Sequence, residues 1–142
     1  MPPGSDRMEP ASAGGAAGVI TKQSSRSVAD TVARFLEILR SKGVKVFTVI
    51  DQRAEARAVD LDLRETTLVV FGNPAAGTPV MDAAPLAALD LPLKVLVWAD
   101  ADRGPQVSYV DPSVLAARYG LTPELAAAFA GIHALTDALV AG

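Results

Sequence analysis

The sequence predicts an α+β domain in which an antiparallel sheet carries helices packed on one face. Near its C-terminal end the chain has two strand-like runs, residues 94–99 and 106–110, and the loop between them contains Gly104 and Pro105. Such a loop is typical of a hairpin, which requires the two strands to be antiparallel. Strands alternate with short helices. No predicted strand is followed by G-x-G-x-x-G, the motif typical of doubly wound parallel sheets that bind dinucleotides.

The helix after Ser27 is the one that the sequence marks most clearly. Ser27 and Asp30 have the spacing of a capping box, which starts a helix at the residue after the serine. Gly43 stands where a helix commonly ends. Between these limits the apolar residues recur at helical spacing: Val28, Val32, Phe35, Leu36 and Leu39. A first strand over residues 21–26 is expected before this helix.

The other elements are predicted from β-branched runs, from capping residues and from prolines. Thr78 has the character of an N-cap with Pro79 at the first helical position, and Pro85 should split the helix that begins there. The remaining predictions are strands over residues 44–50 and 66–71, a short helix over 52–59 capped by Asp51, a helix between Asp111 and Gly120, and a last helix that begins at Thr122.

Length and composition fit one domain preceded by a tail. The chain has 142 residues, of which 50% are hydrophobic and 20% are charged, so it can bury a core without disulfides or a structural metal. Residues 1–18 are rich in Gly, Pro, Ala and Ser and are expected to form a flexible tail, with a single α+β domain over 19–142. Neither the apolar core of a signal peptide nor a run of about 20 apolar residues occurs, so we expect a cytoplasmic protein.

Composition excludes or disfavours several kinds of chemistry. Without cysteine there can be no disulfide, thiolate metal site or thiol nucleophile. The formal net charge is −3 and the 13 Lys and Arg form no basic run, so neither nucleic acid nor a membrane is an expected partner. His133 is the single histidine, and Asp100 and Asp102 do not match the spacing of a calcium loop. We therefore expect no metal site and no cofactor.

Three segments together resemble one bacterial family. They are FGNPAAGTPVM at residues 71–81, DLPLKVLVWAD at 90–100 and VSYVDP at 107–112. On these segments the chain is similar, over residues 24–141, to the family known as domain of unknown function 302. The resemblance implies a TATA-binding-protein-like fold with a β-α-β(n)-α arrangement and suggests homodimers, but it brings no established activity and no catalytic residues. Ala99 departs from the family, which usually has an acidic residue at that place.

The loop from Gly72 to Gly77 is the most informative segment for function. Its glycines have the spacing of a Walker A loop between a strand and a helix, but Thr78 occupies the position of the required lysine, so nucleotide hydrolysis is not expected. N–H groups that follow Thr78 could still attract a carboxylate or another anion, although Pro79 removes one donor. A purely structural turn with an N-cap is the alternative.

Five residues are candidates for contact with a ligand, and each has a structural alternative. Asn73 can present its amide or make an Asx turn, and Met81 can form a pocket wall or fill the core. Lys94 can act as a buried amine or carboxylate partner, or lie at the edge of the sheet. The hydroxyl of Tyr109 can serve a ligand or only satisfy a backbone carbonyl. The full set, expected around one small apolar pocket, is Asn73, Thr78, Met81, Lys94 and Tyr109.

These observations predict a small-ligand-binding or sensing module with a pocket near the loop from Gly72 to Met81 and a small anionic or apolar ligand. A structural or assembly domain, acting as a homodimer or through a protein partner, is the alternative. A small enzyme that uses Lys94 or Tyr109 for acid–base chemistry is the third hypothesis, because cysteine is absent and His133 is isolated. No residue is assigned a catalytic role from the sequence.

Overall fold

The computed structural model describes residues 16–142, so the first fifteen residues of the predicted tail lie outside the described part of the chain. Five strands form one sheet in the order β2-β6-β5-β4-β3, and every neighbouring pair is antiparallel. They are β2 (Val19–Gln23), β3 (Lys45–Asp51), β4 (Thr66–Gly72), β5 (Leu93–Asp100) and β6 (Gly104–Val110). The predicted hairpin joins β5 to β6, and the α+β class with an antiparallel sheet is confirmed.

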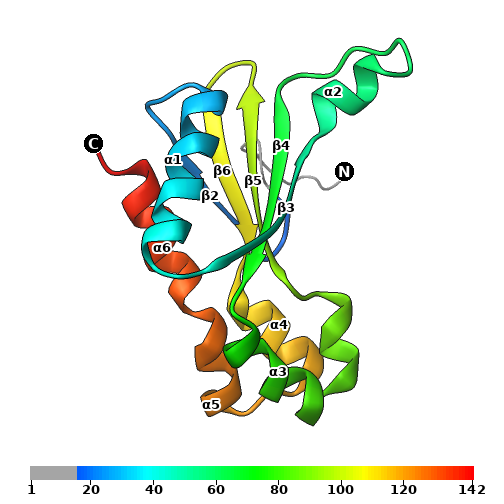
Figure 1. The fold of residues 1–142 in the computed structure, drawn as a ribbon, viewed down its shortest axis with the longest axis vertical. Coiled ribbons are helices and arrows are strands. Elements are labelled where there is room, and N and C mark those ends of the chain that lie inside the picture. The colour runs from blue at the N-terminus through cyan, green and yellow to red at the C-terminus, as the bar shows by residue number, and fades with distance from the viewer. Residues whose placement is uncertain (1–15) are drawn as a thin grey trace, which may run out of the picture.

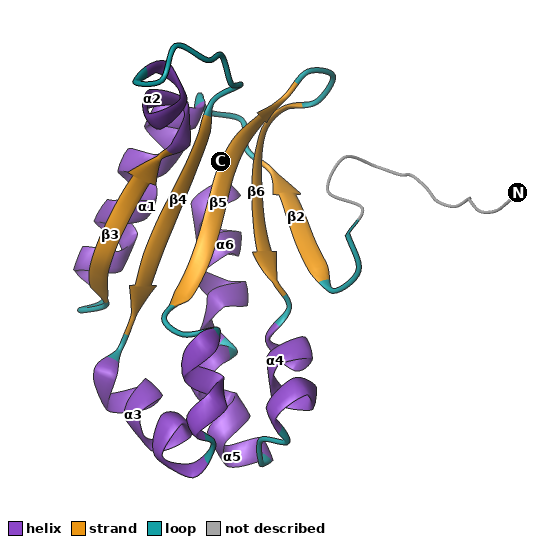
Figure 2. Ribbon diagram, turned by 90° about the vertical axis from the view of Figure 1, so that its right-hand side faces the viewer, coloured by secondary structure: helices purple, strands orange, loops and turns teal. Residues whose placement is uncertain are grey.

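Two helices, α1 (Val28–Ser41) and α6 (Gly131–Val140), lie along one face of the sheet (Figure 1). The ring of Phe35 on α1 meets that of Phe71 on β4 edge to face, with 5.2 Å between the ring centroids. Around this pair the core buries further side chains: Leu39, Val69, Val95, Val97, Val107, Ile132 and Leu139. Each buried side chain of this size stabilises the fold by about 1.5–3 kcal/mol. The opposite face carries no helix within residues 16–142 (Figure 2).

A second group of helices packs at one end of the sheet (Figure 2). It consists of α3 (Pro74–Ala83), the 3-10 helix η1 (Pro85–Leu89), α4 (Pro112–Tyr119), α5 (Pro123–Ala126) and the 3-10 helix η2 (Ala127–Phe129). We call it the end cluster. Its buried centre is formed by Val80, Ala87 and Phe129. The end cluster and the sheet therefore have separate cores, and the segments that leave β4 and enter β5 run between them.

Capping residues explain several of the observed boundaries. The side chain of Ser27 accepts a hydrogen bond of 3.0 Å from the N–H of Asp30, as the capping-box pattern predicts. Gly43, just after α1, and Gly120, just after α4, have φ of 68° and 60°, which L-residues with side chains rarely adopt. The predicted break at Pro85 is confirmed, because η1 begins there.

The predicted start of the third helix at Thr78 is wrong. α3 begins at Pro74, and its cap is Asn73, whose side chain accepts from the N–H of Ala75 at 3.0 Å. Pro74 suits the first helical position because no hydrogen bond is required of its nitrogen there. Pro79 consequently lies inside the helix, where it cannot donate to the carbonyl one turn before it. The asparagine-proline pair was the stronger start signal.

Larger differences from the predicted elements concern the end of the first strand and the last helix. β2 ends at Gln23 rather than at residue 26, because the buried hydroxyl of Ser24 bonds to that of Thr31 at 2.8 Å and turns the chain into α1. The single last helix predicted from Thr122 is divided into α5, η2 and α6. The turn at Ala130 separates η2 from α6, so the segment before it packs in the end cluster and the segment after it packs under the sheet.

The remaining helix, α2 (Gln52–Arg57), projects beyond the sheet near β3 and buries none of its side chains (Figure 1). It begins as predicted after Asp51, whose carboxylate accepts from the N–H of Ala54 at 3.0 Å. Among residues 16–142, none of the helices has the length and apolar character needed to cross a membrane.

Candidate functional site

A pocket of about 310 Å³ lies where the sheet meets the end cluster. From the sheet side its wall is formed by Phe47 of β3, Gly72 of β4 and Leu93 of β5. From the end cluster it is closed by α3 and by Phe129 of η2. Its volume is at the lower end of the range of about 300–1,000 Å³ that is usual for small-molecule sites.

The side chains that line the pocket are almost entirely apolar. Met81 reaches it from the second turn of α3, and Leu91 and Pro92, joined by a cis peptide bond, border it on the way into β5. Among residues 16–142, the polar side chains of its wall come from Asn73 and Thr78 alone. Three of the five residues predicted from the sequence, Asn73, Thr78 and Met81, are therefore brought together here.

Gly77 keeps part of the pocket open, because a larger residue at this position of α3 would place its side chain there. A Cβ built at this residue has Met81 Cε, at 4.0 Å, as its nearest heavy atom outside its own helix backbone, and the backbone there is not in the left-handed region. A side chain at position 77 would therefore project into the pocket without backbone strain. The pocket thus depends on glycine for its volume rather than for its backbone conformation.

The start of α3 has no free donors for an anion in its first turn. The side chain of Asn73 accepts from Ala75, and its backbone carbonyl accepts from the N–H groups of Ala76 and Gly77, both at 2.9 Å. The predicted anion attraction by N–H groups after Thr78 is corrected by this geometry, because Thr78 lies within the helix. Any charge on a ligand must be met by another group.

Lys94 does not line the pocket. It is exposed on β5, and its Nζ donates to the carbonyl of Pro92 at 3.0 Å, at the border of the pocket. An exposed ammonium is not the buried amine that an acid–base role at this position requires. Lys94 is therefore a neighbour of the site and not part of its wall.

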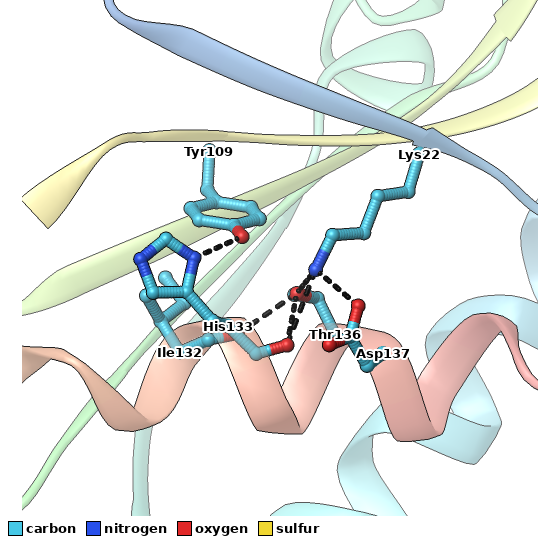
Figure 3. A network of polar contacts seen from close by, with 6 residues as sticks. All are labelled: Lys22, Tyr109, Ile132, His133, Thr136 and Asp137. Carbon is cyan, nitrogen blue, oxygen red and sulfur yellow. Dashed lines mark hydrogen bonds and ion pairs between the residues drawn. The ribbon is translucent and has the colours of Figure 1, made fainter.

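Tyr109 lies away from the pocket, on the face of the sheet that α1 and α6 cover (Figure 3). It is buried on β6, and its hydroxyl lies 2.7 Å from Nδ1 of His133 on α6. The predicted convergence of all five candidates on one cavity is therefore not found. Its hydroxyl meets a histidine side chain rather than the backbone carbonyl considered from the sequence.

Lys22 of β2 completes this polar cluster, which sequence reasoning missed (Figure 3). Its ammonium donates to the hydroxyl of Thr136 at 2.7 Å and to the carbonyl of His133 at 3.1 Å, and it forms an ion pair of 2.7 Å with Asp137. Burial disfavours the charged form, but the hydrogen bond to Asp137 and the contact with Tyr109 outweigh it, so the pKa of Lys22 is raised above its ordinary value. The cluster joins the edge strand to α6.

A second polar contact braces the end cluster beside the pocket. Asp90, which precedes Leu91, accepts hydrogen bonds from the hydroxyl of Tyr119 and from Arg118, the latter at 2.9 Å. The hydrogen bond from Tyr119 is the main cause of a lowered pKa of Asp90, against the effect of burial and with help from Arg118. The same bond raises the pKa of Tyr119. These contacts tie the segment that enters β5 to the end of α4.

The described residues contain no group of three or more histidine or acidic side chains that could hold a metal ion. The pocket walls that sequence reasoning missed are apolar, chiefly Phe47, Leu93 and Phe129. Nothing in their local pattern separates them from core residues. The β-bulge that makes Phe47 an extra residue between Val46 and Thr48 is visible only in the strand pairing of the structure.

A solved structure shows the same fold. The uncharacterized conserved protein DUF302 from Bacillus stearothermophilus superimposes with a TM-score of 0.73, covering 88% of this chain and 97% of that one. The two sequences are 21% identical, so the likeness concerns the fold alone.

Curated relatives are longer than this chain. The fluoride-specific ion channel FluC 1 of Brucella suis is 38% identical over 104 residues, which are 73% of this chain and 41% of that protein. The FluC 1 protein of Brucella abortus is also 38% identical over 104 residues, or 38% of its length. The chain thus spans about two fifths of the length of the relatives it matches. The model of the domain of unknown function DUF302 matches residues 20–139, and the chain belongs to this family.

Proposed function

We propose that this domain is a binding module that takes a small, mainly apolar ligand into the pocket between the sheet and α3. The observation that carries the proposal is the pocket itself, about 310 Å³ in volume, with apolar walls and two polar side chains at one side. Apolar pockets with a few polar groups are the usual form of small-molecule sites. The amide nitrogen of Asn73 and the hydroxyl of Thr78 are the groups that would orient the ligand.

The first experiment fills the pocket with the substitution Gly77→Leu. The new side chain occupies space now open to a ligand, and replacing a helical glycine favours the helix by about 0.5–1 kcal/mol. We expect the variant to fold at least as stably as the parent chain and to lose ligand binding. Thermal stability and amide NMR shifts, measured with toluene, 1-octanol and 2-phenylethanol, test both expectations.

Gly131→Leu is the matched control, because nothing lies within 4 Å of a Cβ added at Gly131 and this residue is not part of the pocket wall. It makes the same chemical change and should bind like the parent chain. Undiminished binding by Gly77→Leu would contradict the proposal. So would the absence of any response of the pocket residues to a broad set of small apolar molecules.

The second candidate is an assembly role, in which the domain acts through a protein partner. The supporting observation is the length of the curated relatives, in which the region that matches this chain makes up about two fifths of a protein named as a fluoride channel. We propose that the domain serves such a channel as an accessory module. Binding and assembly are compatible, since an accessory module can respond to a ligand. Homodimers, which sedimentation velocity would detect, remain a prediction of this candidate.

A further inference from the structure

We propose that the ligand of the pocket is an amphiphilic anion, an apolar body that ends in a carboxylate or a similar group, held at the pocket mouth by Lys45 and Lys94. This inference rests on the proposed binding function and specifies its ligand class. It follows from where the sheet places the two lysines and from the charges around them.

Strand register puts both lysines on the uncovered face of the sheet, on either side of β4. Lys45 is opposite Gly72, and Lys94 is opposite Val70. The side chain of Phe71, between these two positions, is buried in the core under the helices, so residues 70 and 72 face the other way. Two strand spacings of about 4.8 Å across the sheet and an offset of two residues, about 7 Å along the strands, place the two lysine backbones about 12 Å apart.

Each ammonium lies against a residue of the pocket wall. Lys45 Nζ is 4.9 Å from the centroid of the Phe47 ring, and that ring forms the wall on the side of β3. Lys94 Nζ is 3.0 Å from the carbonyl oxygen of Pro92, which borders the pocket on the side of β5. Both positive charges therefore flank the pocket from the sheet side.

The charge of the two lysines is not neutralised by an ion pair with any of residues 16–142. The positive charge of Lys94 interacts electrostatically with the carboxylate of Asp90. That carboxylate already accepts hydrogen bonds from Arg118 and Tyr119. No charged side chain in the described part of the chain lines the pocket. The two ammonium groups therefore add positive charge beside the pocket, while the described residues of its wall offer only apolar contact, the amide of Asn73 and the hydroxyl of Thr78.

The backbone N–H groups at the start of α3 offer no competing site for the anionic end, because they bond to Asn73. A ligand with its apolar part between Met81 and Phe129 can place its head beside Phe47 and Pro92, the wall residues that the two lysines contact. Exposed ion pairs of this kind contribute up to about 1 kcal/mol each, so each lysine should change affinity by about two- to fivefold. The apolar contacts supply the rest.

The test compares acids with neutral molecules that share the same apolar body. The probes are octanoate with 1-octanol and phenylacetate with 2-phenylethanol, each titrated into the whole chain while the amide NMR signals of the pocket residues are followed. We expect each acid to bind more tightly than its alcohol at low salt. Salt should weaken the acids and leave the alcohols nearly unchanged, because screening acts on the charged pair alone.

Lys45→Gln and Lys94→Gln should each weaken the acids by about two- to fivefold and leave the alcohols unaffected. Lys42→Gln, which removes an exposed lysine outside the pocket wall, is the matched control for net charge. Acids and alcohols that bind equally, or lysine variants that behave like Lys42→Gln, would overturn this inference and leave the binding function standing. Silence of all four probes at the pocket residues would overturn both.

Discussion

The hydrogen bond between Tyr109 and His133 shows how the fold changes the meaning of a residue. Tyr109 is predicted from the sequence to contact a ligand, but its hydroxyl lies 2.7 Å from His133 Nδ1, and the centroids of the two rings are 5.6 Å apart. We expect Tyr109→Phe to lower the free energy of unfolding by about 0.5–1.5 kcal/mol, since it removes one hydrogen bond of a buried side chain. Ligand binding in the pocket should be unchanged. Urea unfolding and titration with 1-octanol provide the two measurements.

The opposite result, unchanged stability with weaker ligand binding, would assign Tyr109 to the ligand-binding site. A variant that unfolds like the parent chain yet binds ligand more weakly would mean that Tyr109 contacts the ligand. His133→Ala is the matched change on the other side of the bond, and the double variant should lose less than the sum of the two single losses because both remove the same interaction.

At the scale of elements, Lys22 fastens the edge strand β2 to α6. Its ammonium bonds to Thr136 and His133 and pairs with Asp137, whose side chain is 71% exposed. We expect Lys22→Met to lower the free energy of unfolding by about 1–2 kcal/mol, because several charge-assisted hydrogen bonds are lost together. Asp137→Asn, the matched change, should cost less than about 1 kcal/mol because the ion pair is open to solvent on that side.

The contribution of Lys22 also has a definite dependence on pH. Its pKa is raised in the folded state, so the stabilisation is fully present below the unfolded value of about 10.4 and is lost as pH rises through the folded pKa. The difference in stability between the parent chain and Lys22→Met should therefore be constant from pH 7 to about 9 and shrink above about 10.5. Urea unfolding at a series of pH values measures it. If the stability difference between the parent chain and Lys22→Met grew above about pH 10.5, the stabilising role of the Lys22 ammonium would be contradicted.

Elements were predictable where one residue decides a boundary. Ser27, Gly43, Asp51 and Pro85 act within a few residues of the chain, and the structure has a boundary at each of them. The start of α3 was predicted wrongly because two capping patterns overlap, and the cap at Asn73 followed by Pro74 prevails over the one at Thr78 followed by Pro79. The division of the last helix depends on packing against two separate cores, which no local pattern contains.

The site was predictable only in part, because a pocket belongs to the whole molecule. Asn73, Thr78 and Met81 follow one strand directly, so their proximity could be inferred from sequence distance. Phe47, Leu93 and Phe129 come from three other elements and meet them only when the sheet and the end cluster are packed. Lys45 likewise comes near the pocket only through the pairing of β3 with β4, which places it opposite Gly72.

The proposed assembly role concerns how the whole domain acts within a longer protein. We expect removal of the 104 matching residues from the Brucella suis channel to change its fluoride efflux, measured with a fluoride electrode in liposomes. A module alters a channel when it interacts differently with the open and closed states, and such coupling typically amounts to about fivefold or more. Insertion of residues 20–139 of this chain at the same place should restore the original rate. An unrelated domain of equal length should not, and efflux that is indifferent to the deletion would argue against an accessory role.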